Sequence, residues 1–593
     1  MLLGPKIALI STALFSLTSF SGIADNRISS ESLRQLDPSR IAGSICGQSM
    51  RDVRSRLNWI RIANLAAGAV QAADGPVMLI DGLGDPGFAI STQNPLAQRY
   101  FNQGLMLTYG FNHAEAIRAF REAQRLDPEC AMCWWGEANA LGPNINAPMD
   151  PATNARALEA IGRADALKAG ARPEEQALIL AQKERYSAAA NADRPALDQA
   201  YATAILDVAK QFPQSDTIAV LAAEAEMDVR PWDYWEADRR TPKGRIGDAV
   251  RLIETVLARN PDHPEAAHLY IHLMESAVHP ERAEKAADRL VSLVPGSGHL
   301  VHMPAHLYYV LGRFKDSIRV NVEAARVDES FLLTSKERGI YRFGYYPHNI
   351  HFIVTSAQMG GDSATALREA QRLRGVLNAD ATAATPWVQP VDAAPFLAYA
   401  QYAEPNAILA LKAPDSRLPY VTAMWHYARS IAYARSGNDK AFDREISALR
   451  LIRTKTDFKA MTDMLVPVPD LLKIAELVAQ GRREYAHRRF AAAADFYRQA
   501  ATLEQGVTYY EPPFWYYPVQ QSLGAALYRA GDLMGARQAF MHALGQFPNN
   551  GWALYGLAET NRALGDRPSE AAARAAFGRA WLGNPKWISM DRI

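Results

Sequence analysis

Histidines are the residues whose type and spacing point most directly to chemistry in this sequence. The chain has 593 residues and 13 histidines, nine of which lie within residues 263–351. His268 and His272 are four residues apart, and so are His302 and His306. Residues four apart on an α-helix share one face, so each pair would present two imidazoles side by side. Imidazole nitrogen is a common protein ligand for zinc, copper, iron and nickel, so the pattern indicates a metal site.

The distance in sequence between the two histidine pairs equals the length of a repeat that recurs along the chain. His302 follows His268 by 34 residues, and a frame of small residues, alanines, an aromatic residue and a proline recurs along the chain. Two clear runs of this frame are Gly104, Ala116, Phe120, Ala123 and Pro128, and Gly524, Ala536, Phe540, Ala543 and Pro548. The 34-residue tetratricopeptide repeat (TPR) uses small residues to pack two helices closely and a proline to end the second. The chain from Ala97 to Asp566 resembles TPR proteins.

This resemblance implies an all-α fold, a TPR-type helical-hairpin solenoid (superhelix) with a short irregular N-terminal segment. An aromatic-rich insertion and an aromatic loop interrupt the repeats, and each is either functional or a packing lid. The predicted division is a signal peptide at 1–24, an irregular N-terminal segment at 25–95, N-terminal TPR-like repeats at 96–229, an insertion at 230–248, central His-rich TPR-like repeats at 249–380, and C-terminal TPR-like repeats at 381–593 with the aromatic loop at 506–518.

The same resemblance predicts where the histidines face. In TPR proteins the second, fifth, ninth, twelfth and thirteenth residues of the first helix line the concave groove that binds ligands. The repeat register places seven histidines and one glutamate at such positions, and two carboxylates of the preceding repeat border them. Seven imidazoles could hold one ion, or two ions with about three imidazoles each. The candidate metal ligands are His268, His272, His299, His302, His306, His348, His351, Glu224, Asp228 and Glu275.

Several functions are compatible with such a groove. Many imidazoles and few carboxylates favour copper, with iron or zinc as alternatives, and so favour a metal-dependent oxidoreductase. A zinc ion that activates water would make the protein a hydrolase, with Glu224, Asp228 or Glu275 as general base. The groove could instead be a metal-free or structurally metallated scaffold that binds a small molecule, a peptide or a protein partner. A further alternative is that the histidines are only structural.

The remaining histidines are predicted to be structural or exposed, with a role in the site as the alternative for His113, and Glu137 is predicted to be either paired structurally or part of a functional cavity. His113 replaces a packing aromatic at a turn. Glu137 occupies a position that is usually apolar, so it needs a partner, and Asn144 and Asn146 are the nearest candidates. His263 and His279 adjoin prolines and should be exposed in turns, and structural roles are expected for His426, His487 and His542.

The cysteines give a weak signal. The chain has three, of which Cys130 and Cys133 are three residues apart and Cys46 is alone. A Cys130–Cys133 disulfide is conceivable, but a helix through both residues would disfavour it. A single CxxC pair is also weak as a zinc motif.

The N-terminus and the overall charge bear on location and partners. Lys6 precedes an apolar run over residues 7–20, and small residues end at Ala24. This pattern predicts a signal peptide cleaved after Ala24, or an uncleaved anchor, and therefore a periplasmic or secreted protein. No second apolar run is long enough to span a bilayer. A net charge of +1 gives no electrostatic basis for binding nucleic acid.

Two local strings extend the resemblance beyond the repeat. They are Gly298-His299-Leu300-Val301-His302-Met303-Pro304-Ala305-His306 and Tyr346-Pro347-His348-Asn349-Ile350-His351. Both are similar to strings in a subfamily of large exported bacterial TPR proteins. The resemblance implies the architecture and no particular reaction.

Overall fold

The chain folds into α-helices joined by short turns. A computed structural model describes residues 77–189, 191–335, 341–507 and 510–593, and these residues contain no β-strand beyond two isolated bridges. The all-α prediction is therefore confirmed. The predicted signal peptide, Cys46 and most of the predicted N-terminal segment lie outside the described residues. Within the described part, no helix combines the length and the hydropathy needed to cross a membrane.

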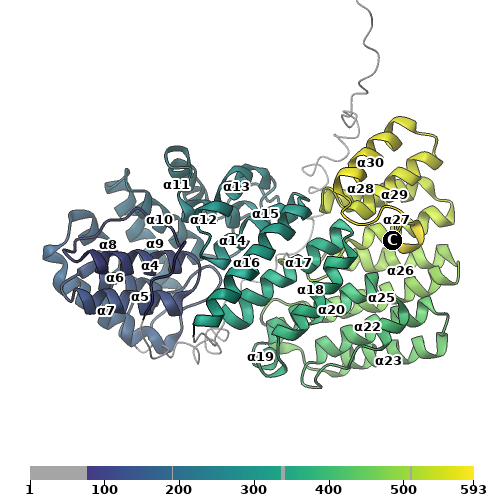
Figure 1. Cartoon of the computed structure of the whole chain (residues 1–593), viewed down its shortest axis with the longest axis horizontal. Helices are drawn as coiled ribbons and strands as arrows, with labels where there is room; N and C mark the ends of the chain where they lie inside the picture. Colours follow the sequence, from purple (N-terminus) through teal and green to yellow (C-terminus); the bar gives the residue numbers. More distant parts are fainter. Residues whose placement is uncertain (1–76, 190, 336–340, 508–509) are drawn as a thin grey trace, which may run out of the picture.

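The N-terminal and central helices follow one another from the purple end of the molecule to its middle, and the C-terminal helices form the other side, with α28 to α30 (residues 533–580) above α22 to α25 (residues 419–486) (Figure 1). The N-terminal helices are α4 (Pro95–Tyr109), α5 (His113–Leu126), α6 (Ala131–Ala140), α7 (Asn154–Leu167), α8 (Pro173–Lys183), α9 (Arg194–Gln211), α10 (Asp216–Val229) and α11 (Ile246–Arg259). The central helices are α12 (Pro264–Met274), α13 (Glu284–Leu293), α14 (Gly298–His302), α15 (Pro304–Val310), α16 (Phe314–Thr334), α17 (Tyr346–Gly360) and α18 (Ser363–Val376).

The C-terminal part continues the same pattern. Its helices are α19 (Ala379–Ala384), α20 (Gln389–Tyr402), α21 (Pro405–Leu409), α22 (Pro419–Arg435), α23 (Asp439–Lys455), α24 (Lys459–Thr462), α25 (Val468–Ala486), α26 (Phe490–Glu504), α27 (Val519–Ala530), α28 (Leu533–Gln546), α29 (Gly551–Ala563) and α30 (Arg567–Ala580). Short 3-10 turns lie at Pro151–Thr153, Lys168–Gly170, Pro280–Ala283, Pro386–Val388 and Met590–Arg592, and a π-helical turn lies at Tyr341–Tyr345.

Glycines pressed against aromatic rings hold each repeat together. A Cβ added to Gly104 or Gly136 would lie 2.7 or 2.3 Å from the ring of Phe120, which is fully buried between α4, α5 and α6. Gly524 and Gly556 meet the ring of Phe540 in the same way, at 2.9 and 2.2 Å. Two helices can approach this closely only where a side chain is missing, which is the packing that the sequence frame predicts. The TPR-type solenoid is therefore confirmed by the chain's own packing.

The C-terminal repeats fold back onto the central ones. Helix α29 contacts α17, the indole N–H of Trp552 donates to the carbonyl of Gln358 at 2.8 Å, and the backbone N–H of Leu582 donates to the carbonyl of Gly360 at 2.8 Å. The aromatic loop between α26 and α27 therefore ends beside α17 rather than at the far end of the molecule. This return brings a distant part of the sequence to the central histidines.

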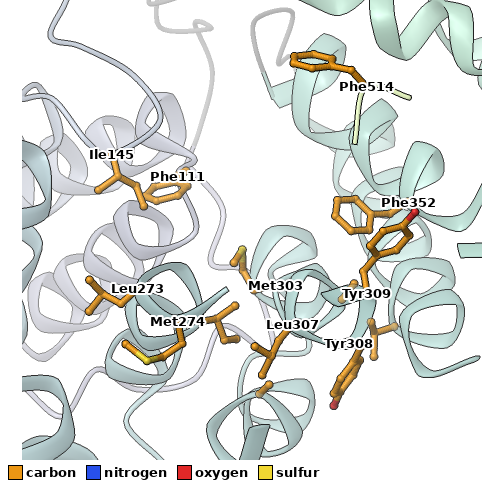
Figure 2. Packing of buried hydrophobic residues seen from close by; sticks show 14 of the residues in the cluster. Phe111, Ile145, Leu273, Met274, Met303, Leu307, Tyr308, Tyr309, Phe352 and Phe514 are labelled. Atoms are coloured by element: carbon orange, nitrogen blue, oxygen red, sulfur yellow. The ribbon is translucent and has the colours of Figure 1, made fainter. Parts of the chain in front are cut away.

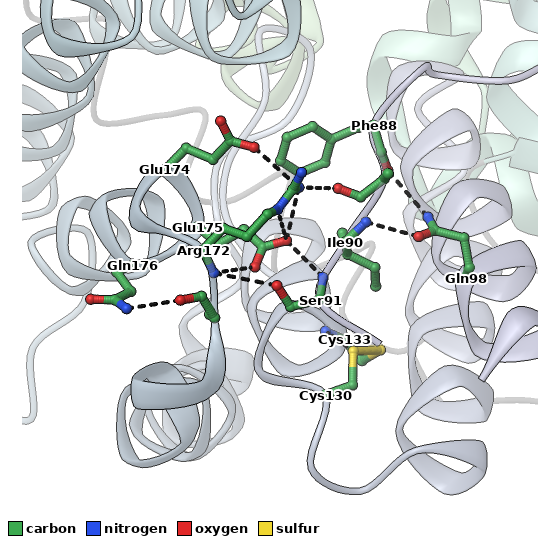
Figure 3. A network of polar contacts seen from close by, with 12 residues as sticks. Phe88, Ile90, Ser91, Gln98, Cys130, Cys133, Arg172, Glu174, Glu175 and Gln176 are labelled. Carbon is green, nitrogen blue, oxygen red and sulfur yellow. Dashed lines mark hydrogen bonds and ion pairs between the residues drawn. A yellow bond between two sulfur atoms is a disulfide. The ribbon is translucent and has the colours of Figure 1, made fainter. Parts of the chain in front are cut away.

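The chain before α4 is tied to α8 by a network of polar contacts (Figure 3). The backbone N–H of Ser91 donates to the buried carboxylate of Glu175 at 2.8 Å, and the other oxygen of Glu175 accepts from the N–H of Arg172 at 2.9 Å. The side chain of Gln98 accepts from the N–H of Ile90 at 2.8 Å. These bonds satisfy backbone groups of an extended segment that has no strand partner among the described residues.

Cys130 and Cys133 form a disulfide, contrary to the expectation that helix geometry would disfavour it (Figure 3). Cys130 is the N-cap of α6 and has extended backbone angles, so only Cys133 lies inside the helix. The bend at the cap brings the two Cα atoms to 5.4 Å, which is an ordinary separation for a disulfide.

The glycine packing leads to a stability prediction. Gly136→Ala should lower the free energy of unfolding by about 1–3 kcal/mol, because the new methyl group overlaps the Phe120 ring. Gly162→Ala is the matched control, since a Cβ at Gly162 in α7 meets no atom within 4 Å. The control should be neutral or stabilising by up to about 1 kcal/mol through helix propensity. Thermal unfolding followed by circular dichroism compares the two, and equal melting temperatures would refute the packing role.

Candidate metal centre

Three successive first helices of the central repeats carry the histidines. Helix α12 provides the first pair, α14 and α15 together provide the second pair, and α17 provides the last. Helices α14 and α15 meet at Met303, because Pro304 has no N–H to continue the helix. His302 and His306 lie on the two sides of this break, and both are buried.

Cluster 1 consists of His268, His272 and His299, each of which can offer one ring nitrogen within 4.8 Å of the others. The Nε2 atoms of His268 and His299 are 3.3 Å apart. The Nδ1 atoms of His268 and His272 lie 2.9 Å from the carboxylates of Glu265 and Glu275, respectively. When the carboxyl group is ionised it accepts from an Nδ1–H, which leaves the lone pair on Nε2, although burial raises the pKa of both Glu265 and Glu275. The Nε2 atom of His272 is buried without a hydrogen-bond partner among the described residues.

Cluster 2 consists of His302, His306 and His348, which meet the same criterion. The Nε2 atoms of His302 and His306 are 2.7 Å apart. The ring of His348 lies 4.9 Å from that of His302 and 5.6 Å from that of His306, measured between centroids. The two clusters adjoin each other, since the rings of His272 and His306 are 5.7 Å apart.

The tautomer of His302 is fixed by a chain of hydrogen bonds. The amide nitrogen of Asn321 donates to the carbonyl of Ser317 at 2.8 Å, so its oxygen is the atom that faces His302. That oxygen lies 2.5 Å from Nδ1 of His302, which must therefore be protonated. The Nε2 atom of His302 consequently presents a lone pair to Nε2 of His306. In a neutral His306 the Nε2 atom would also carry a lone pair, because the single proton would be on Nδ1, which faces the carboxylates of Glu275 and Glu511.

Glu275 joins the two clusters. One carboxylate oxygen accepts from His272 of cluster 1 and the other accepts from His306 of cluster 2, both at 2.9 Å. Glu275 is fully buried. A second carboxylate, that of Glu511 in the aromatic loop, also contacts Nδ1 of His306. Glu275, His306 and Glu511 thus form a third group with ligand-type geometry.

Burial sets the charge of most of these imidazoles. It lowers the pKa of His268 to about 3 and holds the pKa values of His272, His299, His302 and His348 well below the ordinary value. These rings are therefore neutral at pH 7, the state that binds metal.

His306 is the exception among the clustered rings. Burial alone would lower its pKa, but the carboxylates of Glu511 and Glu275 outweigh burial and raise the pKa to about 10. A metal ion bound at Nε2 of His306 would therefore have to displace a proton at pH 7.

Aromatic side chains cover the clusters. The ring of Phe111 lies 4.9 Å from those of His268 and His299, and that of Phe352 lies 4.9 Å from that of His302. Figure 2 shows Phe111 on the N-terminal side of this region, and Phe352 and Phe514 on the other. The clustered histidines are buried because residues from the turn after α4, the insertion and the aromatic loop contact their rings. The sequence frame carries no information about these contacts.

Three predicted ligands lie apart from the clusters. Asp228 is paired with Arg185 at 2.6 Å, and both are buried. Glu224 lies on the same helix near Arg185, and burial raises its pKa to about 7. His351 lines a separate hollow with Tyr510 and Phe514. On α17 the face toward cluster 2 is formed by His348 and Phe352, whereas His351 is rotated by roughly 60° from His348.

Other sequence predictions need correction. His263 is not exposed but buried, as the N-cap of α12 that accepts from the N–H of Ala266. Glu137 is bonded to Arg121, Arg156 and Gln124 rather than to the predicted asparagines.

The remaining histidines lie outside the clusters. His113 bonds to the carbonyl of Ala140 and to Asn144. His279 is exposed as predicted, and His426 and His487 pair with Glu445 and Asp439. His542 is partly buried on α28.

The sequence interpretation missed three residues that orient the imidazoles: Glu265, Asn321 and Glu511. Glu265 precedes His268 by three residues on α12, and Glu275 follows His272 by three. Residues three apart on a helix are neighbours, so this spacing could have revealed Glu265. Asn321 lies on α16, and Glu511 is 205 residues from its partner, so no local pattern points to either.

One distance in cluster 1 is compatible with two ligands of a tetrahedral metal site. Two nitrogens bound to one ion at about 2.0–2.1 Å lie roughly 3.3 Å apart when the angle is tetrahedral. The Nε2 atoms of His268 and His299 have this separation. The Nε2 atoms of His302 and His306 are closer, so those two rings would have to part by roughly half an ångström to bind an ion. Both clusters could hold a metal ion.

Comparisons with known proteins add little beyond the fold. No family model matches the chain, and no curated protein matches it. Solved structures that align with it include a human IFIT1 dimer with m7Gppp-AAAA, with 13% identity over 93% of this chain and 98% of that one and a TM-score of 0.31. The APC/C hetero-tetramer Cut9-Hcn1 aligns with 12% identity over 83% and 97% and a TM-score of 0.24. Scores this low follow the succession of helices and define no shared site.

Asp328 anchors the elements that carry His299 and His348. Its buried carboxylate accepts from the hydroxyl of Tyr341 at 2.8 Å and from the side-chain amide of Asn349 at 2.7 Å. A Cβ on Gly298, at the start of α14, would lie 1.8 Å from the same carboxylate. Asp328 therefore holds together α16, the turn before α17, and the start of α14.

Asp328 also leads to a prediction about pH. Burial raises its pKa to about 7, whereas an unfolded aspartate titrates near 3.8. The folded protein therefore holds this proton more tightly, so its stability should fall as the pH rises from about 4 to 7. Asp328→Asn mimics the protonated form. Its free energy of unfolding relative to that of the wild type should therefore increase over that interval, by about 4 kcal/mol at most. Melting temperatures of both proteins between pH 5 and pH 8 test this, and a constant difference would contradict it.

Proposed function

We propose that this chain is a metalloprotein that binds two transition-metal ions, one at cluster 1 and one at cluster 2. The observation that carries the proposal is the gathering of six imidazoles into two groups of three, within each of which the ligand nitrogens all lie within 4.8 Å of one another. Four of these rings have Nδ1 beside an oxygen atom, which directs Nε2 toward the other rings. At pH 7 the proton held by His306 lies between its Nε2 atom and that of His302, and with the third imidazole, that of His348, these rings form a set that could bind a metal ion in place of that proton.

The donor set favours copper. Each cluster offers three imidazole nitrogens and no thiolate, and the nearest carboxylates contact Nδ1 atoms. Oxygen acceptors at Nδ1 orient ligating histidines and raise their basicity, as is usual around protein metal sites. Nitrogen-rich sites suit copper, iron and zinc, and copper binds most tightly among the divalent ions.

Redox chemistry is the activity that we propose for these ions. Hydrolysis by zinc would need a general base beside the metal. Among the predicted bases, Glu275 already accepts from two imidazoles and Asp228 is paired with Arg185. Glu224, whose pKa is raised to about 7, belongs to none of the groups with ligand-type geometry among the described residues, so none of the three suits that role. Two copper ions in adjoining, buried clusters could exchange electrons with a substrate, and the apolar walls would exclude water. The chain's residues would bind the ions, fix the imidazole tautomers and restrict access.

A structural role for the ions is the second candidate. The central histidines contact Phe111 from the N-terminal repeats and Glu511 from the C-terminal loop. Bound metal would then stabilise the contacts of the central repeats with the N-terminal repeats and the C-terminal loop, as metal does in structural zinc sites. A colourless zinc protein whose stability depends on the metal would favour this reading over redox chemistry.

Metal analysis of matched variants tests the proposal. The wild type, loaded with copper and desalted, should retain two ions per chain and show a visible absorption band that ascorbate bleaches. His268→Ala/His299→Ala and His302→Ala/His348→Ala should each retain one ion, because each variant removes two of the three ligands of one cluster. His279→Ala, an exposed histidine outside both clusters, should retain two. Loss of both ions in the control variant, or two ions in either cluster variant, would overturn the assignment.

A further inference from the structure

The side chain of Glu275 lies between two groups of imidazoles that belong to different clusters. Its two oxygens are each 2.9 Å from an Nδ1 atom, one on His272 and the other on His306. No other carboxylate of the described residues makes hydrogen bonds to both clusters: Glu265 reaches only His268, and Glu511 contacts His306. Glu275 is fully buried, and it ends α12 as the C-cap.

Building on the proposed two-ion centre, we propose that Glu275 links the two clusters so that filling one favours filling the other. A single rigid carboxylate sets the orientation of two imidazoles at once. When a metal ion binds Nε2 of His272, the Nδ1–H becomes more acidic and its hydrogen bond to Glu275 strengthens. The carboxylate is then fixed in place, and with it His306. The second ion meets a ligand that is already oriented, so less ordering is needed to bind it.

Charge acts in the same direction. Two divalent ions in adjoining clusters repel each other, and the clusters are close, with 5.7 Å between the ring centroids of His272 and His306. The carboxyl group of Glu275 lies against both of these rings, and a negative charge that it acquires in the loaded centre would offset part of that repulsion in a buried, low-dielectric region. Removing its charge should therefore weaken the second binding step more than the first.

The aromatic loop provides a matched control for this idea. Glu511 also has a carboxyl group against Nδ1 of His306, and it hydrogen-bonds to the side chain of Glu275. Glu511→Gln therefore changes a neighbouring carboxyl group but leaves both Glu275–imidazole hydrogen bonds in place, whereas Glu275→Gln changes the residue that contacts both clusters. In Glu275→Gln both imidazoles keep an acceptor, because the glutamine oxygen can serve His272 while Glu511 serves His306. The two variants therefore differ in the link and not in whether His306 has an acceptor.

Native mass spectrometry of the folded, full-length protein with one equivalent of Cu²⁺ per chain tests the proposal. Two independent sites give singly loaded chains in about half of the population or more at this loading, whatever their relative affinities. The wild type should instead divide mainly into empty and doubly loaded chains. Glu275→Gln should raise the singly loaded fraction to about half or above, a loss of coupling of about tenfold or more. Glu511→Gln should keep the wild-type distribution.

A second measurement separates the link from damage to cluster 1. In His302→Ala/His348→Ala, cluster 2 is disabled while the contact between Glu275 and His306 is retained. Adding Glu275→Gln to this background should change the copper affinity of cluster 1 far less than it changes the coupling in the intact protein. A wild type that takes up two ions but is mostly singly loaded would overturn the link and leave the proposed function standing. A wild type that takes up no copper would overturn both.

Discussion

The orientation of buried imidazoles is the constraint on which the rest of the central structure depends. Six rings lie in two adjoining clusters, and oxygen acceptors at Nδ1 fix the tautomers of His268, His272, His302 and His306. With their protons on the outer nitrogens, His268, His272 and His302 direct lone pairs inward, whereas His306, with its raised pKa of about 10, holds a proton there at pH 7. A buried lone pair that faces another one is costly unless a cation lies between them. The chemistry of the site follows from this single arrangement.

The surrounding fold makes that arrangement possible. Successive TPR-type hairpins place equivalent helix positions side by side, and the glycine contacts at Phe120 and Phe540 show how tightly the hairpins pack. The C-terminal repeats return to α17 and bring Glu511 to His306. The centre is consequently assembled from the central repeats, the N-terminal aromatic cover and a distant loop. This assembly explains why the histidines are buried rather than spread along an open groove.

The fold and much of the arrangement of the histidines could be predicted from the sequence, because both follow from the 34-residue repeat. A 34-residue repeat and pairs of histidines four residues apart indicated His268, His272, His302 and His306, and the groove positions implied by the resemblance to TPR proteins added His299 and His348. The repeat register could not predict contacts made by chain segments that lie outside the repeats. His351 was assigned to the site, but α17 uses Phe352 on that face, and Asp228 turns to Arg185 because a buried carboxylate needs a partner. Asn321 and Glu511 had no local signal.

The most direct test is the position of the ions themselves. Crystals of the copper-loaded protein, measured at the copper absorption edge, should give two anomalous peaks per chain. One peak should lie about 2.0–2.1 Å from nitrogens of His268, His272 and His299, and the other at the same distance from nitrogens of His302, His306 and His348. Peaks at other residues, or imidazole rings that point away from one another with no peak between them, would contradict the account.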